Sequence, residues 1–293
     1  MNPLLNIAIR SVYQIVGKLI SKMYDAIYHC KHQDYDREIA FLIDNIEETI
    51  AYCISKHYSE HEFFLNNKRI FNQKQHRKST RWFINFLKDD VNWIKRIPHF
   101  CISISVVQKD RLVISVVYDP MLNETFYAHQ GSGARLNQYR LRIQDKRTIS
   151  STSRSPIVLS INQIFQEDME YLTIYSDVLN VLLKACSVRI TGSIDLDLAY
   201  VAANRIDAMV LMGNEKMIED EIYNASLIVK EAGGTITYGY CSEKKEEKPF
   251  KKNTTEKDQH VHFLQIVCAG EPQTVGLIAD LLQSKFDVIH FKT

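Results

Sequence analysis

The sequence predicts an α+β protein, and three features of the chain carry this prediction. Residues 101–107 (CISISVV) and 111–118 (RLVISVVY) are apolar, β-branched runs joined by a tight turn, which is the pattern of a β-hairpin. Residues 4–20 instead repeat apolar side chains at helical spacing. Beyond residue 156, short apolar runs alternate with longer amphipathic segments, as strands alternate with helices.

The first half is predicted to consist of helices followed by the hairpin. A second amphipathic helix is expected over 36–57, and residues 59–81 are expected to be irregular. The hairpin turns at Lys109-Asp110, a third strand follows at 124–128, and a glycine-containing loop occupies 131–137. Because its two runs hold almost only apolar or small residues, the hairpin is expected at the centre of a sheet, buried on both faces.

The second half is predicted to alternate strands and helices after a Ser/Thr-rich connection at 145–155. A helix over 219–232 ends at Gly233-Gly234, since glycine accepts the left-handed conformation of a helix cap. The remaining strands are expected at 156–160, 187–190, 207–212, 235–239 and 263–268, and the remaining helices at 168–185, 194–203 and 272–284.

The composition is ordinary for a soluble globular protein, with 45% hydrophobic and 24% charged residues among 293. The formal net charge of +1 provides no overall field that would attract nucleic acid or a membrane. None of the six cysteines forms a CxxC pair, a pattern that fits a reducing cytoplasm. Arg10, Lys18 and Lys22 interrupt the N-terminal apolar stretch, so we expect a helix packed on the body and no membrane partner. The alternative is a helix that lies on a membrane surface.

Several motifs, in order along nearly the whole chain, resemble the inositol monophosphatase family. Residues 93–100 (WIKRIPHF) and 139–142 (YRLR) resemble bacterial members in particular. The other motifs are Tyr118-Asp119-Pro120-Met121, Gly131-Ser132-Gly133-Ala134, Gly192-Ser193, Asp197-Leu198-Ala199-Tyr200 and Glu231-Ala232-Gly233-Gly234. The resemblance implies an α+β fold, a layered αβαβα sandwich in which helix pairs alternate with two sheets. It also implies a homodimer and one domain, 1–293, whose halves 1–145 and 156–293 are not independent.

The resemblance also implies a magnesium site, and this chain departs from it. In the family, carboxylates hold Mg²⁺ ions that activate a water and neutralise the phosphate. The family's Glu-Glu pair falls on Asn66-Asn67, and the two aspartates of its Asp-Pro-(Ile/Leu)-Asp-Gly-Thr-Thr motif fall on Asn85 and Lys88. An asparagine offers an oxygen without charge, and the Lys88 ammonium would repel a cation. We therefore expect no catalytic residue, no metal site and no cofactor.

Some carboxylates survive near these positions. Asp89 and Asp90 stand where the family has Gly and a water-activating Thr, and Asp44 matches an aspartate linked to a weaker ion. Asp220 and Glu221 fall near the family's Trp-Asp, in which the aspartate is a ligand. We expect Asp44, Asp220 and Glu221 to be relics on solvated helix faces. In the alternative interpretation, Asp44, Asp89, Asp90 and Glu221 supply an atypical Mg²⁺ site.

Two functions from different classes follow from the resemblance. Bacterial members of this kind are known both as phosphatases and as non-enzymatic members of the ribosomal-RNA transcription antitermination complex, where they dock on Nus factors such as NusA and on RNA polymerase. A role that needs no metal would allow the ligands to be lost while the fold is kept. We favour a non-enzymatic scaffold that supports ribosomal-RNA transcription and folding. The alternative is a Mg²⁺-dependent inositol-1-phosphate phosphatase.

Two groups of basic residues are candidate interaction surfaces. Cations within the well-matched segments are interface candidates, because a surface charge is not retained for burial; these are Lys95, Arg96, Arg135 and Arg140. Residues 68–81 (KRIFNQKQHRKSTR) hold six lysines and arginines and no acid. A basic loop is most often simply solvated, but this one could contact RNA or an acidic protein surface.

Overall fold

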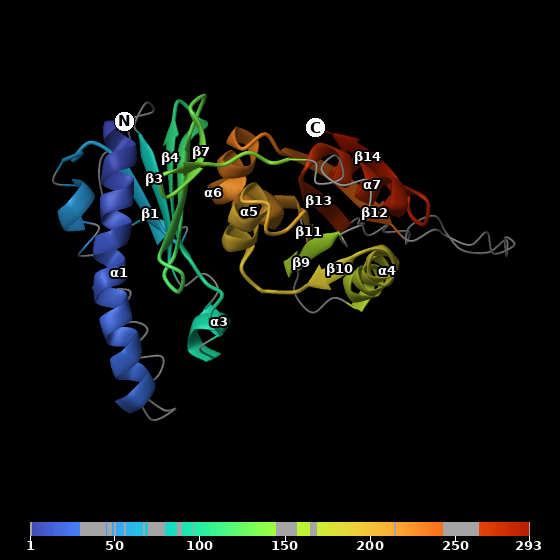
Figure 1. Cartoon of the computed structure of the whole chain (residues 1–293), viewed down its shortest axis with the longest axis horizontal. Helices are drawn as coiled ribbons and strands as arrows, with labels where there is room; N and C mark the ends of the chain where they lie inside the picture. Colours follow the sequence, from blue (N-terminus) through green and yellow to red (C-terminus); the bar gives the residue numbers. More distant parts are fainter. Residues whose placement is uncertain are drawn as a thin grey trace, which may run out of the picture. The chain divides into compact units, whose positions relative to one another are not determined.

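The structure is a computed structural model with two compact units. One unit comprises residues 1–141 and 223–231, and the other comprises 142–222 and 232–293. Each unit contains its own sheet with helices packed on it (Figure 1). The residues described are 2–29, 45, 49, 51–55, 57–66, 68–69, 80–86, 90–95, 97–144, 157–164, 169–213, 215–242 and 264–292.

The first unit is built on an eight-stranded sheet with the order β2-β1-β3-β4-β5-β6-β7-β8. The predicted hairpin, β4 and β5, lies at the centre of this sheet. Residues 102–107 of β4 and 114–119 of β5 are all buried, and Lys109 and Asp110 both adopt positive φ, as a two-residue hairpin turn requires. The strands are β1 Glu62–Leu65, β2 Lys68–Arg69, β3 Arg81–Phe86, β4 Ile102–Gln108, β5 Arg111–Asp119, β6 Glu124–His129, β7 Gly133–Leu136 and β8 Tyr139–Arg140. The prediction of a central hairpin is confirmed.

Helices cover both faces of this sheet. Helix α1 (Pro3–His29) lies along one face (Figure 1), and its buried Ala8, Val12 and Ile15 belong to a core cluster that also holds Trp82 and Ile84 of β3. Successive side chains of a strand point to opposite faces, so Phe83 and Asn85 of β3 face away from α1. Residues 223–231 of helix α6 (Glu215–Glu231) pack on that second face. The sheet therefore has an α1 face and an α6 face.

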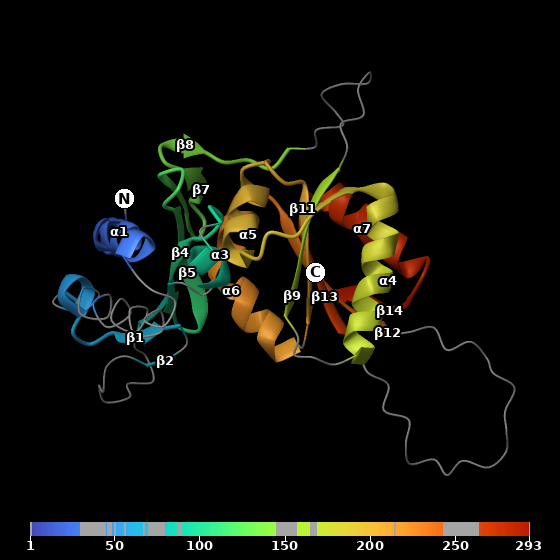
Figure 2. The same ribbon diagram turned by 90° about the horizontal axis from the view of Figure 1, so that it is seen from below.

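The second unit has a six-stranded sheet with the order β10-β9-β11-β13-β12-β14. Helices α4 (Met169–Ala185) and α7 (Pro272–Gln283) cover one face, where Ile174, Val178 and Ile278 join the buried core, and α5 (Ile194–Ala202) lies on the other (Figure 2). The strands are β9 Val158–Ile164, β10 Ser187–Arg189, β11 Ala208–Gly213, β12 Thr235–Ser242, β13 Leu264–Gly270 and β14 Asp287–Lys292. Two sheets with packed helices confirm the α+β class.

Several predicted boundaries are corrected by the structure. Residues 59–81 are not wholly irregular, because β1 alternates buried Phe63 and Leu65 with half-buried neighbours and pairs in parallel with β3. Strand β14 and the short helix α3 (Asp90–Lys95) were also missed. Such elements hold too few residues for a period to stand out. Within the expected helix 36–57, residues 45 and 49 are helical and Ala51–Ser55 form a π-helix; its other residues and the connection 145–155 lie outside the described residues.

A histidine accepts the hydrogen bond of the buried tryptophan in β3. The indole N–H of Trp82, which is fully buried, donates to Nδ1 of His61 at 3.0 Å. The His61 ring also stacks on Tyr58 with centroids 4.6 Å apart. Burial lowers the pKa of His61, against a smaller opposing effect of Glu60. Nδ1 must stay unprotonated to accept this bond, so the fold selects the neutral imidazole.

We predict that this contact makes stability fall with acidification. Because the pKa of His61 is lower in the folded chain than its usual 6.5, the unfolded chain binds more protons in that window. Stability is therefore full above about pH 6.5 and declines as the pH falls toward the folded pKa. The urea midpoint of His61→Gln, which keeps an acceptor, should depend less on pH between about 7 and 5 than that of the unmodified chain. The control is His57→Gln at an exposed site; an equal flattening there would contradict the assignment.

Candidate functional site

Asn66 and Asn85 lie side by side at the ends of two parallel strands. The N–H of Asn66 donates to the carbonyl of Ile84 at 2.9 Å, which continues the β1–β3 register and sets Asn66 next to Asn85. Asn66 has φ 45°, a left-handed turn conformation that asparagine tolerates, and this turn ends β1. The structure thus brings together two of the positions that resemble metal ligands.

Asn85 is a buried amide with an unused donor. The residue is 3% exposed, and its Nδ2 has no hydrogen-bond partner among the described residues. The residue directly opposite on β4 is Ser103, which is also buried. A buried amide N–H without an acceptor costs about 1–3 kcal/mol. Asn66 and Asn85 together offer neutral oxygens and N–H donors, and no negative charge.

Small polar side chains fix α6 over this face of the sheet. Ser105 and Ser115 face each other across β4 and β5. Both hydroxyls donate to the backbone carbonyl of Asn224, the first at 3.2 Å. All three residues are buried, so these bonds form away from water. This contact sets the position of α6 residues 223–231 relative to Asn85.

A row of aromatic rings borders the two asparagines. Phe64 and Phe83, each two residues before an asparagine, stack with centroids 4.9 Å apart and an interplanar angle of 12°. Tyr223 of α6 meets Phe83 edge-on at 6.5 Å. Burial raises the pKa of Tyr223, so its phenol is neutral and no base at ordinary pH. Among the described residues, the place that resembles a metal site is therefore lined by amides and aromatic rings.

The other candidate positions are spread over several elements. Asp90 begins α3, and Asp220 and Glu221 belong to α6, but the side chains of all three lie outside the description. Lys95 is exposed in the last turn of α3. Positions wholly outside the described residues are Asp44, Asn67, Lys88, Asp89, Arg96 and, within the basic segment, residues 70–79.

Two acids of the motifs have structural partners. Asp119 accepts hydrogen bonds from the N–H groups of Met121 and Leu122 at 2.8 and 3.1 Å, so it holds a turn. Asp197 is fully buried inside α5 and accepts from the hydroxyls of Ser160 and Thr191 and from the amide of Asn162. Its role is to tie β9 to the loop before α5.

The polar groups of the α6 face and of the glycine loop were not predicted from the sequence. The alternation of serine with isoleucine in 102–105 is a period-2 signal that could have shown a polar strip on one face of β4. No such signal marks His129, which meets Asn2 only through the fold.

Across the part of the chain that the structure describes, no group of three or more His, Cys, Asp or Glu is placed to hold a metal ion. None of the described helices has the length and apolar character needed to span a bilayer.

Comparison with known proteins gives one consistent family. The family model described as the inositol monophosphatase family matches residues 1–272. Nus factor SuhB of Buchnera aphidicola from Schizaphis graminum is 36% identical over 253 residues, which is 85% of this chain and 89% of the relative. Nus factor SuhB of Escherichia coli K12 is 35% identical over 242 residues, 81% of this chain and 85% of the relative. The resemblance to bacterial SuhB carried by residues 93–100 and 139–142 is confirmed.

Solved structures show the fold. The SuhB crystal structure from Bartonella henselae superimposes with a TM-score of 0.67 at 21% identity, over 96% of this chain and all of that one. Inositol monophosphatase from Anabaena gives a TM-score of 0.67 at 20% identity, over 96% of this chain and 95% of that one. The layered α+β sandwich is therefore the fold of this chain. With a family model that matches most of its length and relatives more than one-third identical, the chain belongs to the inositol monophosphatase family.

Proposed function

We propose that this chain is a non-enzymatic, SuhB-like scaffold of ribosomal-RNA transcription antitermination. The observation that supports this most is Asn85, a buried neutral amide where the family resemblance places a metal-binding carboxylate. The relatives at 35–36% identity carry the name Nus factor SuhB, and this name supports a role in transcription. A scaffold requires surfaces and a stable fold, and both are compatible with a site that lacks charge.

The described side chains do not suit Mg²⁺. This ion binds hard oxygen ligands, and in proteins it is usually held by carboxylates and waters. Asn66 and Asn85 provide no charge, and an N–H donor such as Nδ2 of Asn85 carries the same sign of partial charge as the ion. Lys88, by sequence, adds a full positive charge to the same segment. Chemistry that depends on a metal-activated water is accordingly not part of the proposal.

We predict that the purified chain binds no Mg²⁺ measurably and releases no phosphate from inositol 1-phosphate with Mg²⁺. Calorimetric titration with MgCl₂ checks the first point, and a phosphate-release assay checks the second. Robust Mg²⁺-dependent phosphate release would favour the alternative of an atypical metal site, with Asp44, Asp89, Asp90 and Glu221 as its ligands.

A carboxylate introduced at position 88 alone should not restore Mg²⁺ binding or phosphatase activity. Lys88→Asp removes the repulsion, but Asn67 and Asn85 still lack charge, so we expect no Mg²⁺ binding from this variant. The matched comparison is the combined variant Asn67→Glu, Asn85→Asp and Lys88→Asp, titrated in the same way. Activity in Lys88→Asp alone would show that one ammonium, rather than the loss of carboxylates, inactivates the site.

Exposed cations are the candidate contacts of the scaffold with NusA and RNA polymerase. Lys95, Arg135 and Arg140 are all exposed, and none of them pairs with an acid within the described residues. An arginine can hold a partner's carboxylate with two parallel hydrogen bonds. Lys95 lies at the end of α3, whereas the two arginines lie on β7 and β8. These are two separate places on the first unit, and each can be tested alone. A homodimer and an RNA contact through 68–81 remain parts of the proposal.

We predict that the chain retains NusA and RNA polymerase from a bacterial lysate. Lys95→Ala with Arg96→Ala, or Arg135→Ala with Arg140→Ala, should weaken retention by about 2 kcal/mol, roughly thirtyfold, if that place is the centre of the interface. Lys184→Ala, an exposed lysine of α4, is the control and should retain both partners. If the folded, unmodified chain retains neither partner, the scaffold proposal is wrong.

A further inference from the structure

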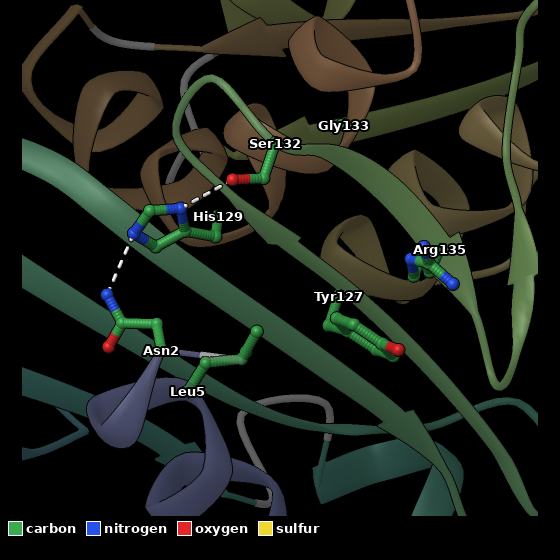
Figure 3. A pocket seen from close by; sticks show the side chains of 7 residues that line it. All are labelled: Asn2, Leu5, Tyr127, His129, Ser132, Gly133 and Arg135. Carbon is green, nitrogen blue, oxygen red and sulfur yellow. Dashed lines mark hydrogen bonds between the residues drawn. The ribbon is translucent and has the colours of Figure 1, made fainter.

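A pocket of about 570 Å³ opens on the α1 face of the first unit, between the start of α1 and strands β6 and β7 (Figure 3). Tyr127 faces α1, and its partner across the strands is Arg135, so both side chains are on this face. Asn85 lies on the α6 face of the same sheet. The pocket is therefore a different site from the one that resembles the family's metal centre.

Two arginines stand opposite each other beside this pocket. Arg135 of β7 lines it, and Arg140 of β8 is its direct cross-strand neighbour. Gly133, which also lines the pocket, has φ +82°, and a Cβ built there would lie 3.3 Å from Nε and Nη2 of Arg140. The Arg140 guanidinium is thus at the rim. Like charges directly opposite on neighbouring strands destabilise a sheet.

This double positive charge is not neutralised by the described residues. The Arg135 guanidinium donates to the carbonyl of Gln138 at 3.2 Å, and no ion pair is formed by either arginine within the described chain. The carboxylate of Glu231 accepts the N–H groups of Gly131 and Gly133 at 2.7 Å each and forms no ion pair with either arginine in the described chain. The two arginines therefore have capacity for an anion from outside.

A chain of hydrogen bonds at the other end of the pocket orients a hydroxyl. The N–H of Leu4 donates to Oδ1 of Asn2 at 2.9 Å, which leaves Nδ2 of Asn2 to donate to Nε2 of His129 at 2.8 Å. Nδ1 of a neutral His129 then carries the proton and donates to Oγ of Ser132 at 2.9 Å. Ser132 is an acceptor in this chain, so its own proton is available to a ligand.

The loop that carries Ser132 is held before any ligand arrives. Glu231 binds the N–H groups on both sides of Ser132, and the N–H of Ser132 itself donates to the carbonyl of His129 at 2.9 Å. In Figure 3, Arg135 lies at one end of the pocket, the Asn2–His129–Ser132 chain at the other, and Tyr127 and Leu5 between them. The pocket thus offers the cation of Arg135, an apolar surface at Tyr127 and Leu5, and a neutral donor at Ser132.

We propose that this pocket binds a small organic phosphate. Its phosphate group pairs with Arg135 and Arg140, its carbon skeleton lies against Tyr127 and Leu5, and one of its other oxygens accepts from Ser132. A phosphate monoester carries about −1.5 to −2 charges at pH 7, which two guanidinium groups balance. A single carboxylate would leave one of them unbalanced. The volume lies within the range of about 300–1,000 Å³ typical of small-ligand sites.

The test is calorimetric titration of the full chain with glycerol 3-phosphate, in phosphate-free buffer that contains a chelator so that no metal takes part. We expect binding of glycerol 3-phosphate and none of glycerol. Arg135→Gln and Arg140→Gln should each weaken binding about tenfold or more, as expected for hydrogen bonds to a charged group, and Ser132→Ala about threefold. The control is Arg189→Gln, which removes the same charge from an exposed arginine of β10. It should leave the affinity for glycerol 3-phosphate unchanged.

Several results would overturn the proposal. These are no binding of glycerol 3-phosphate, an equal loss in Arg189→Gln, or unchanged affinity in both pocket arginine variants. A parallel titration with a short oligouridylate separates the sources of phosphate, because binding of RNA without binding of glycerol 3-phosphate would assign the arginines to a nucleic acid. The titration needs no protein partner, so its failure is distinguishable from failure of the scaffold proposal, which also has Lys95 and Arg96 as candidate contacts.

Discussion

Burial of the β4–β5 hairpin on both faces is the constraint on which the first unit depends. Its apolar side chains pack on α1, and its serines bond to the carbonyl of Asn224 in α6. A strand can be covered on both sides only if its polar atoms find partners, because a buried hydroxyl without one is costly. The shared acceptor at Asn224 meets that need for Ser105 and Ser115 and fixes where α6 lies.

Because the two faces of this sheet are covered by different helices, residues on the α6 face can change without altering the packing on the α1 face. A change on the α6 face, such as a carboxylate replaced by Asn85, leaves the side chains that contact α1 untouched, because alternate residues of β3 point to opposite faces. The packing of Trp82 and Ile84 therefore does not require a metal on the other side. This separation is compatible with the proposal that the family fold persists without negative charge at the positions that resemble its ligands.

At the other edge of the same sheet, charge is concentrated rather than lost. Arg135 and Arg140 face each other without an acid between them in the described chain, while the Glu231 carboxylate holds the adjacent loop. Repulsion between the two guanidinium groups is tolerable at an exposed edge, where water screens it. An anion bound between the two guanidinium groups would replace their repulsion with attraction. The proposed phosphate would therefore offset the electrostatic cost of placing two arginines opposite each other.

The sequence alone determined the class of fold and the family, and it predicts the loss of the metal-binding carboxylates, because period and motif are properties of neighbouring residues. The hairpin 101–118, the helix ends at Gly233 and most elements of the second half followed from local pattern. Only the tertiary structure decided that Asn66 lies beside Asn85, that His61 holds Trp82, and that Asn2 reaches His129 across more than one hundred residues. Contacts of that kind depend on which strands pair and on which face of the sheet each side chain lies. The spacing of apolar residues within one segment determines neither.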